Sequence, residues 1–260
     1  MDFLISACSD IGIRKTSNQD SVLLEVAATD IGKVAICVIC DGMGGLSKGE
    51  VASAEVIKAF TQWFHTRLPE LLAQGKLDER FRAEWEEIIV EQNKRISDYS
   101  RRNGIAMGTT LVAVLMFGNK YYAVNVGDSR LYKLDNKLTQ ISKDQSYIQR
   151  EIDMGRMTVE ESKYSPKRNV LLQCVGASPV VVPDYFTGDT VDGDVFMLCS
   201  DGFRHVITQE EIYDNFMPSV LTNEKIMREK AKLLVDINKQ RMEKDNISVA
   251  LVKVIAGRDS

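Results

Sequence analysis

The residues of this chain best placed for chemistry are aspartates that follow apolar runs. Residues 34–40 lead directly into Asp41, and residues 195–199 lead, after one serine, to Asp201. A carboxylate at the end of a buried strand has lost much of its hydration, so it stays ionised only where a cation or a hydrogen-bond donor compensates it. The two segments therefore predict a site for a metal ion or a phosphate group.

Two further aspartates lie at the edges of segments with strand character. Asp245 comes shortly before the apolar run 247–255, and Asp20 closes the polar stretch 14–19. Oxygen ligands without histidine or thiolate suit hard cations such as Mg²⁺ or Mn²⁺ better than Zn²⁺. The chain has only 2 histidines, which argues against a zinc site built on histidine ligands.

These aspartates have to be positioned by a mixture of strands and helices. Short apolar or alternating runs predict strands at residues 3–9, 21–28, 33–40, 109–117, 121–126, 130–134, 138–141, 195–199 and from 246 onward. Apolar residues at helical spacing predict helices from residue 48 to Pro69 and over 81–99, 158–162, 209–216 and 223–241, with their aromatic side chains in the core. We therefore expect an α+β fold in which two antiparallel sheet groups, covered by helices, form a sandwich that brings the aspartates together at the sheet edges.

Length, composition and charge predict a single domain, residues 1–260, without nucleic-acid or membrane partners. Hydrophobic residues make up 44% of the 260 and charged residues 27%, and no internal repeat or linker is evident. The net charge of −4 and the lack of a basic block argue against binding to nucleic acid. No apolar run approaches the roughly 18 residues of a membrane span, and the N-terminus lacks the positive charge of a signal peptide. We therefore expect a cytoplasmic protein, and a monomer because no coiled coil or apolar interface stands out.

Residues 145–180 are the least periodic part of the chain. They combine one short predicted helix with a loop, and we interpret them as a mobile flap subdomain. The flap carries Lys163, Lys167 and Arg168, which could contact a phosphopeptide. Solvation of an ordinary exposed surface is the simpler interpretation of these three charges.

The 5 cysteines, an odd number, predict buried reduced thiols rather than disulfides. Cys37 and Cys40 have the spacing of a redox or zinc motif. Residues three apart on a strand point to opposite faces, however, so the two sulfur atoms should not converge.

Six short motifs follow one another along the chain. They are Arg14 with Asn18-Gln19-Asp20, Asp41-Gly42-Met43-Gly44-Gly45, Gly108-Thr109-Thr110, Gly127-Asp128-Ser129-Arg130, Ser200-Asp201-Gly202 and Asp245-Asn246-Ile247-Ser248. Each is weak alone, but in this order and spacing they resemble the metal-dependent protein phosphatases, the PPM or type 2C family, over residues 5–255. The resemblance, which is to bacterial members, implies a four-layer α-β-β-α sandwich with two Mn²⁺ or Mg²⁺ ions in a cleft at one end. It also implies hydrolysis of phosphoserine and phosphothreonine in proteins by a metal-bridging water, in opposition to a bacterial serine/threonine kinase.

The resemblance assigns metal ligands residue by residue. Asp41 would bridge the two ions, with the carbonyl oxygen of Gly42 and waters completing one shell. Asp201 and Asp245 would bind the other ion. Gly42 and the glycines after it would let the backbone approach the ions and turn into the following helix.

The same resemblance gives roles to three other residues. Arg14 would clamp the phosphate, since a planar guanidinium binds two phosphoryl oxygens at once. Asp20 would hold metal-bound water from the outer shell, and Asp128 with Asp201 would hold a third, more weakly bound ion. Two plainer interpretations stay open, with Arg14 as an ordinary surface residue and Asp128 as the turn former of a hairpin.

Three positions depart from the family pattern. Met43 stands where several members have a histidine that is proposed to protonate the leaving group, and methionine cannot donate a proton. Gln19 replaces a glutamate, and Gln145 replaces the histidine of an Asp-His-Ser motif. These changes bear on the proton path and the outer shell and leave the inner metal ligands intact.

Two other functions are weighed against the phosphatase. A catalytically weak module could use the same fold to sense a phosphorylated partner, but a charged cluster that is costly when unoccupied argues against it. A nucleotide phosphate loop over residues 42–48 is disfavoured because its spacing does not match Gly-x4-Gly-Lys-Ser/Thr.

Overall fold

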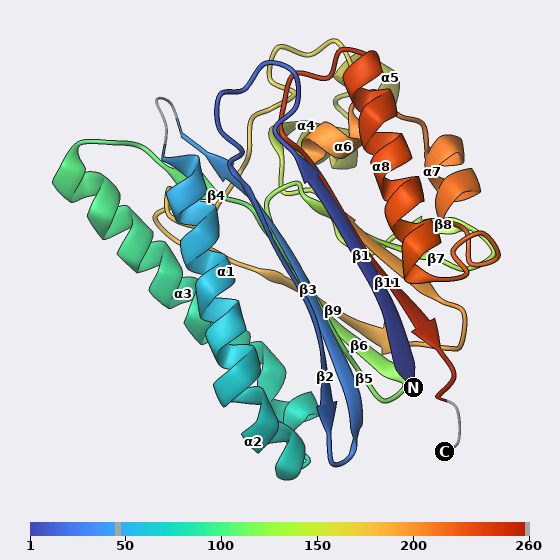
Figure 1. Cartoon of the computed structure of the whole chain (residues 1–260). Coiled ribbons are helices and arrows are strands. Elements are labelled where there is room, and N and C mark those ends of the chain that lie inside the picture. The colour runs from blue at the N-terminus through green and yellow to red at the C-terminus, as the bar shows by residue number, and fades with distance from the viewer. Residues whose placement is uncertain (45–47, 258–260) are drawn as a thin grey trace.

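Two antiparallel sheets flanked by helices make up the computed structural model, which describes residues 1–44 and 48–257 (Figure 1). Gly45 of the second motif lies outside the described residues. The strands are β1 (Asp2–Asp10), β2 (Asp20–Thr29), β3 (Gly32–Met43), β4 (Gly108–Thr109), β5 (Leu111–Phe117), β6 (Lys120–Val126), β7 (Arg130–Leu134), β8 (Leu138–Gln140), β9 (Asp184–Asp189), β10 (Val195–Cys199) and β11 (Ile247–Ile255). The helices are α1 (Gly49–Thr66), α2 (Leu68–Ala73), α3 (Leu77–Asn103), α4 (Tyr147–Asp153), α5 (Val159–Ser162), α6 (Asp201–Arg204), α7 (Gln209–Phe216) and α8 (Glu224–Gln240).

The strands divide between a sheet A and a sheet B. Sheet A has the order β1-β11-β10-β7-β8, and sheet B has the order β2-β3-β5-β6-β9, with the short β4 paired to β3. Figure 1 shows α1 and α3 on the outer side of sheet B, and α7 and α8 on the outer side of sheet A. The prediction of an α+β fold with the α-β-β-α layer order is confirmed.

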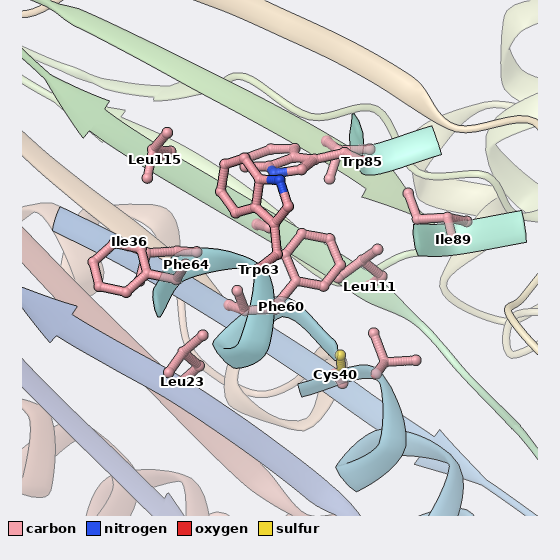
Figure 2. Packing of buried hydrophobic residues seen from close by; sticks show 14 of the residues in the cluster. Leu23, Ile36, Cys40, Phe60, Trp63, Phe64, Trp85, Ile89, Leu111 and Leu115 are labelled. Atoms are coloured by element: carbon pink, nitrogen blue, oxygen red, sulfur yellow. The ribbon is translucent and has the colours of Figure 1, made fainter. Parts of the chain in front are cut away.

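Three hydrophobic clusters fill the three interfaces between these layers. The first joins α1, α2 and α3 to sheet B, the second joins α6, α7 and α8 to sheet A, and the third lies between the sheets. In the first cluster the ring of Trp85 meets those of Phe60 and Trp63 edge to face, with centroids 5.5 and 5.6 Å apart (Figure 2). The helical aromatic residues therefore pack in the core, as their spacing predicted.

Strand β3 explains the continuous apolar run before Asp41. All of residues 34–40 are buried because helices cover one face of the strand and sheet A covers the other. Cys40 belongs to the helix-facing cluster and Cys37 to the cluster between the sheets, so their sulfurs do point apart. All five cysteines are unbridged.

Four short elements, α2, α4, α6 and β9, were not predicted. Helix α1 ends at Thr66, close to the predicted exit at Pro69, but a new helix, α2, begins at Leu68, since proline is well suited to the first turn of a helix. Helix α4 follows Ser146 as N-cap. Neither α4 nor β9 shows a clear periodicity of apolar residues in the sequence. Strand β9 lies at the edge of sheet B, where its side chains are partly buried or exposed.

Candidate active site

The predicted acids converge at one end of the sandwich. Asp20 and Asp41 are direct partners in the β2–β3 ladder, and Asp201 begins α6 at the end of β10. Burial raises the pKa of Asp41 well above its ordinary value, and the charges of four neighbouring acids add to that shift. These neighbours are Asp20, Asp201, Asp128 and Asp245. The structure therefore brings together all five acids that the sequence singled out.

Close packing of the backbone at Gly202 against the backbone at Asn246 places Asp201 beside Asp245. A Cβ atom on Gly202 would lie 2.1 Å from the carbonyl oxygen of Asn246 and 3.2 Å from the Cβ atom of Asp245. Any side chain larger than hydrogen would force these segments apart. The glycine of the Ser-Asp-Gly motif is therefore needed for the two carboxylates to lie together.

Gly42, at the end of β3, also allows two backbone segments to pack closely. A Cβ atom there would lie 2.2 Å from the carbonyl oxygen of Gly49 and 2.6 Å from that of Gln19. The amide of Gly42 donates to the same Gln19 oxygen at 3.1 Å. The first turn of α1 thus packs directly on the backbone next to Asp41. Gly49, which the sequence analysis did not single out, completes this contact.

Two threonines hold the backbone of Asp41. The Asp41 amide donates to Thr110 Oγ1 at 3.0 Å, and the Thr110 amide donates to the Asp41 carbonyl oxygen at 2.9 Å. Thr109 Oγ1 donates to that same oxygen at 3.0 Å. Both threonines are buried, so the Gly-Thr-Thr motif fixes the direction in which the Asp41 side chain leaves the strand.

Asp20 is a buried carboxylate with one unused oxygen. Its Oδ2 accepts a hydrogen bond from Ser200 Oγ at 2.9 Å, whereas its Oδ1 is buried without a hydrogen-bond partner in the described part of the chain. Burial raises the pKa of Asp20 to about 6, with the hydrogen bonds of Ser248 and Ser200 opposing the rise and the charges of two nearby aspartates adding to it. An oxygen left in this state is a ready acceptor for a cation or for water held by one.

Asp245 is paired with a lysine that sequence reasoning missed. Lys15 Nζ lies 2.6 Å from Asp245 Oδ1, and both side chains are about one-third exposed. Burial opposes the charge of Lys15, but the hydrogen bond and charge of Asp245, together with the charges of Asp41 and Asp201, raise its pKa. Lys15 is adjacent to the predicted phosphate clamp in sequence, and this was the only available signal for it.

Asn246 holds the loop that carries Arg14. Its Oδ1 accepts from the amide of Gln19 at 2.9 Å, and its Nδ2 donates to the carbonyl oxygens of Ile11 at 3.0 Å and Ser17 at 3.1 Å. Arg14 itself is exposed on this loop. Asn246 therefore fixes both ends of the segment from which Arg14 projects.

Asp128 already has a cationic partner. Arg204 Nη2 donates to the Asp128 carbonyl oxygen at 3.1 Å and to its Oδ2 at 3.3 Å. Burial and the charge of Asp201 raise the pKa of Asp128 to about 6, against the opposing charge of Arg204. The residue connects β6 of sheet B to β7 of sheet A, so its interpretation as the turn of a hairpin is wrong.

His205 is a second residue that sequence reasoning passed over. Its Nε2 lies 3.4 Å from Asp201 Oδ2, and its Nδ1 lies 3.4 Å from Glu243 Oε2. Burial opposes the charge of His205, but the hydrogen bond of Glu243 and the charges of both acids raise its pKa. The spacing of four residues from Asp201 was a usable signal, because such pairs meet on a helix.

The donor set fits divalent cations that prefer oxygen. Within residues 1–44 and 48–257, no group of three or more His, Cys, Asp or Glu side chains is arranged so that it could hold a metal ion by itself. Mg²⁺ in proteins keeps several waters and takes one or two carboxylates, so an open group of acids suits it. The orphaned oxygen of Asp20 and the raised pKa of Asp41 both indicate a site that lacks positive charge. The arrangement can hold hard cations and act on a phosphate group.

Sequence comparisons agree with this chemistry. A model of the protein phosphatase 2C family matches residues 13–238. The serine/threonine phosphatase stp of Listeria welshimeri is 32% identical over 234 residues, which are 86% of this chain and 88% of that protein. The serine/threonine protein phosphatase PstP of Mycobacterium tuberculosis is 33% identical over 253 residues, 96% of this chain, and the chain spans 45% of that protein's length.

A solved structure shares the whole architecture. The catalytic domain of the serine/threonine protein phosphatase PstP, in complex with two manganese ions, superimposes with a TM-score of 0.78 at 29% identity. The superposition covers 98% of this chain and 99% of that one. The likeness therefore extends over both sheets and the helices outside them.

Proposed function

The chain belongs to the protein phosphatase 2C family, and we propose that it is a metal-dependent phosphatase that removes phosphate from serine and threonine residues of proteins. The observation that carries this proposal is the convergence of Asp20, Asp201 and Asp245 on the half-buried Asp41. Carboxylates gathered without enough positive charge are costly in a structural role, and phosphate chemistry is one of the few uses that repays the cost.

We propose that Asp41, Asp201 and Asp245 hold two divalent cations, Mn²⁺ or Mg²⁺, with the carbonyl oxygen of Gly42 as a further ligand. When bound, such ions lower the pKa of water and stabilise charge on the attacked phosphoryl group, so no protein nucleophile is needed. The chain's own contribution is to fix the acids. Thr109 and Thr110 orient Asp41, and Gly202 allows Asp201 and Asp245 to lie together.

Arg14 and Asp20 complete the proposed catalytic group. Arg14 is exposed on a loop anchored by Asn246, so its guanidinium is free to bind two phosphoryl oxygens in parallel. Lys15 adds positive charge beside it. The unused Oδ1 of Asp20 is positioned to accept a hydrogen bond from a water molecule at the site. Met43 cannot protonate the leaving group, so that proton comes from water or from another residue.

We propose that residues 145–180 form a flap that meets the phosphoprotein. The segment includes α4 and α5 and leaves apolar side chains unusually open, with Tyr164 83% and Val159 64% exposed. Two of its basic residues have local partners: Lys163 Nζ lies 2.7 Å from Glu160 Oε2, and Lys167 Nζ lies 4.5 Å from the centroid of the Tyr147 ring. This pairing favours the plainer interpretation of the basic cluster and leaves the apolar surface as the contact.

The proposed substrates are proteins phosphorylated on serine or threonine, since the relatives are named serine/threonine phosphatases, and we propose that a bacterial serine/threonine kinase phosphorylates them. None of the helices in the described residues is long and apolar enough to cross a membrane. A cytoplasmic monomer is the form that we propose, with cell fractionation and analytical ultracentrifugation as the measurements.

Hydrolysis of para-nitrophenyl phosphate and of a phosphothreonine peptide tests the function. We expect turnover with Mn²⁺ or Mg²⁺, none with EDTA, and a loss of at least about a thousandfold in Asp201→Asn. Asp214→Asn, an exposed aspartate on α7, is the matched control and should keep full activity. A folded, metal-loaded chain that binds the phosphopeptide without turning it over would instead favour the phospho-sensing module.

A further inference from the structure

Arg204 occupies the side of the acid cluster where Asp128 stands. It is the last residue of α6, three positions after Asp201. Besides its two contacts to Asp128, its Nη2 lies 3.5 Å from Asp144 Oδ2. The Arg204 side chain is only 16% exposed, so the guanidinium is enclosed with these acids rather than extended into water.

The charges on this side of the cluster are balanced by arginines. Asp144 forms a two-pronged pair with Arg130, with Nε to Oδ1 and Nη2 to Oδ2 both at 2.7 Å. Asp128 and Asp144 therefore face the fixed positive charges of Arg130 and Arg204.

The other side of the cluster has no such balance. There, among the described residues, Lys15 pairs with Asp245, and His205, which is charged only when protonated, lies 3.4 Å from Asp201 Oδ2. The shortage of positive charge is thus confined to Asp20, Asp41, Asp201 and Asp245, which is where the proposed ions would bind.

We propose that Arg204 is a built-in cation that takes the place of a third divalent ion at Asp128, so that the centre binds two ions. The proposal rests on the proposed function, since it presupposes the two-ion centre. A divalent ion needs oxygen atoms about 2.1 Å away in a near-octahedral shell, and a guanidinium that contacts the same carboxylate oxygen occupies that space and repels the ion. Arginine stays charged at every physiological pH, so its charge does not depend on the metal concentration.

The position of Arg204 also limits how it can move. One of its contacts is to the carbonyl oxygen of Asp128, which belongs to the connection between the two sheets. The guanidinium is therefore tied to the backbone as well as to the carboxylate. Asp128 becomes a residue that positions Arg204 against the end of α6, and it is not a metal ligand in this chain.

Counting bound Mn²⁺ tests the proposal independently of activity. Equilibrium dialysis over a range of Mn²⁺ concentrations, with metal analysis and electron paramagnetic resonance of the free ion, gives the number of ions per chain. We expect two ions in the native chain, an unchanged count in Asp128→Asn, and a third, weaker ion in Arg204→Ala. The double variant Arg204→Ala/Asp128→Asn should return to two ions.

Controls separate the arginine effect from misfolding. Arg228→Ala removes an exposed arginine on α8 and should bind two ions. Arg204→Gln keeps a polar side chain that can donate a hydrogen bond but removes the charge, and it should also admit the third ion, which protects the test if Arg204→Ala unfolds in thermal melts.

Two results would overturn the proposal. One is a third ion in the native chain that disappears in Asp128→Asn, because Asp128 would then be a ligand. The other is a count of two bound ions in both folded Arg204 variants, because Arg204 would then not be what excludes a third ion. A native chain that binds fewer than two ions would instead contradict the proposed two-ion phosphatase itself.

Discussion

Asp20 and Asp41 lie directly opposite each other across the β2–β3 ladder. Like charges in directly opposed strand positions are destabilising, and here burial makes the repulsion stronger. Burial raises the pKa values of both carboxyl groups, with the charge of Asp20 adding to the shift at Asp41 and the charges of Asp201 and Asp245 adding to the shift at Asp20. The pair therefore lowers the stability of the metal-free fold in exchange for a site that attracts cations.

The metal-free protein should become more stable as the pH is lowered from 7 to about 5. The pKa of folded Asp20 is about 6, above its ordinary value of 3.8, so the folded state binds the proton more tightly than the unfolded state. Stability is then lost as the pH rises between these two values. Thermal melts in EDTA across this range measure the effect, and Asp20→Asn should flatten the profile. Identical slopes in the native and variant proteins would contradict this origin.

Asp41→Asn should abolish activity and raise the stability of the metal-free protein. The change removes one of the mutually repelling charges while nearly keeping the side-chain shape. A gain of about 1 kcal/mol corresponds to a rise in Tm of roughly 2–4 °C for a chain of this size. Differential scanning calorimetry in EDTA, compared with Asp214→Asn, provides the measurement. A lower Tm would mean that the carboxylate is satisfied in the metal-free fold.

Gly202→Ala should unfold the site and much of sheet A. Its Cβ atom would lie 2.1 Å from the carbonyl oxygen of Asn246, so the backbone has to shift. We expect a loss of about 3 kcal/mol, the upper end of the usual cost of overpacking, because the clash is with backbone that cannot rotate away. Urea denaturation measures it.

Gly155→Ala is the comparison for that variant. Gly155 has a positive φ of 67° and nothing within 4 Å of an added Cβ, so only backbone strain applies. That strain costs about 1–2 kcal/mol. Equal losses in the two variants would show that the contact to Asn246 is not what requires glycine at 202.

Asn246→Ala should weaken substrate binding more than turnover. The amide makes three hydrogen bonds to the loop that carries Arg14, and without them the clamp is less well positioned. We expect the KM for a phosphothreonine peptide to rise by about tenfold, the equivalent of roughly 1.4 kcal/mol. Steady-state kinetics at saturating Mn²⁺ tests this. An unchanged KM would mean that other contacts hold the loop.

The acids of the site could be predicted because their strands are buried on both faces. Such strands appear as continuous apolar runs, and a carboxylate at the end of one is conspicuous. Asp41 and Asp201 stand out in this way, and the order of the six motifs then indicates their neighbours. The two-sheet architecture could be predicted for the same reason, since most of the strands have strong apolar patterns.

The cationic partners could not be found by the same means. Lys15 and Arg204 lie in polar segments where a charged residue is ordinarily a solvated one, and only the tertiary fold brings them to Asp245 and Asp128. Gly49 was missed because its contact with Gly42 crosses from a strand to a helix. Spacing along the sequence indicates which residues are neighbours within one helix or strand, whereas these contacts join separate parts of the fold.

The position of β11 between β1 and β10 in sheet A affects how the protein folds during synthesis. Sheet B takes its strands from residues 20–189, so it can pack against α1 and α3 while the rest of the chain is still being made. Strand β1 has no partner until β11 appears between it and β10. Asp245 arrives together with that strand. A nascent chain therefore lacks the complete group of acids around Asp41 until β11 has been made, however well its first half has already folded.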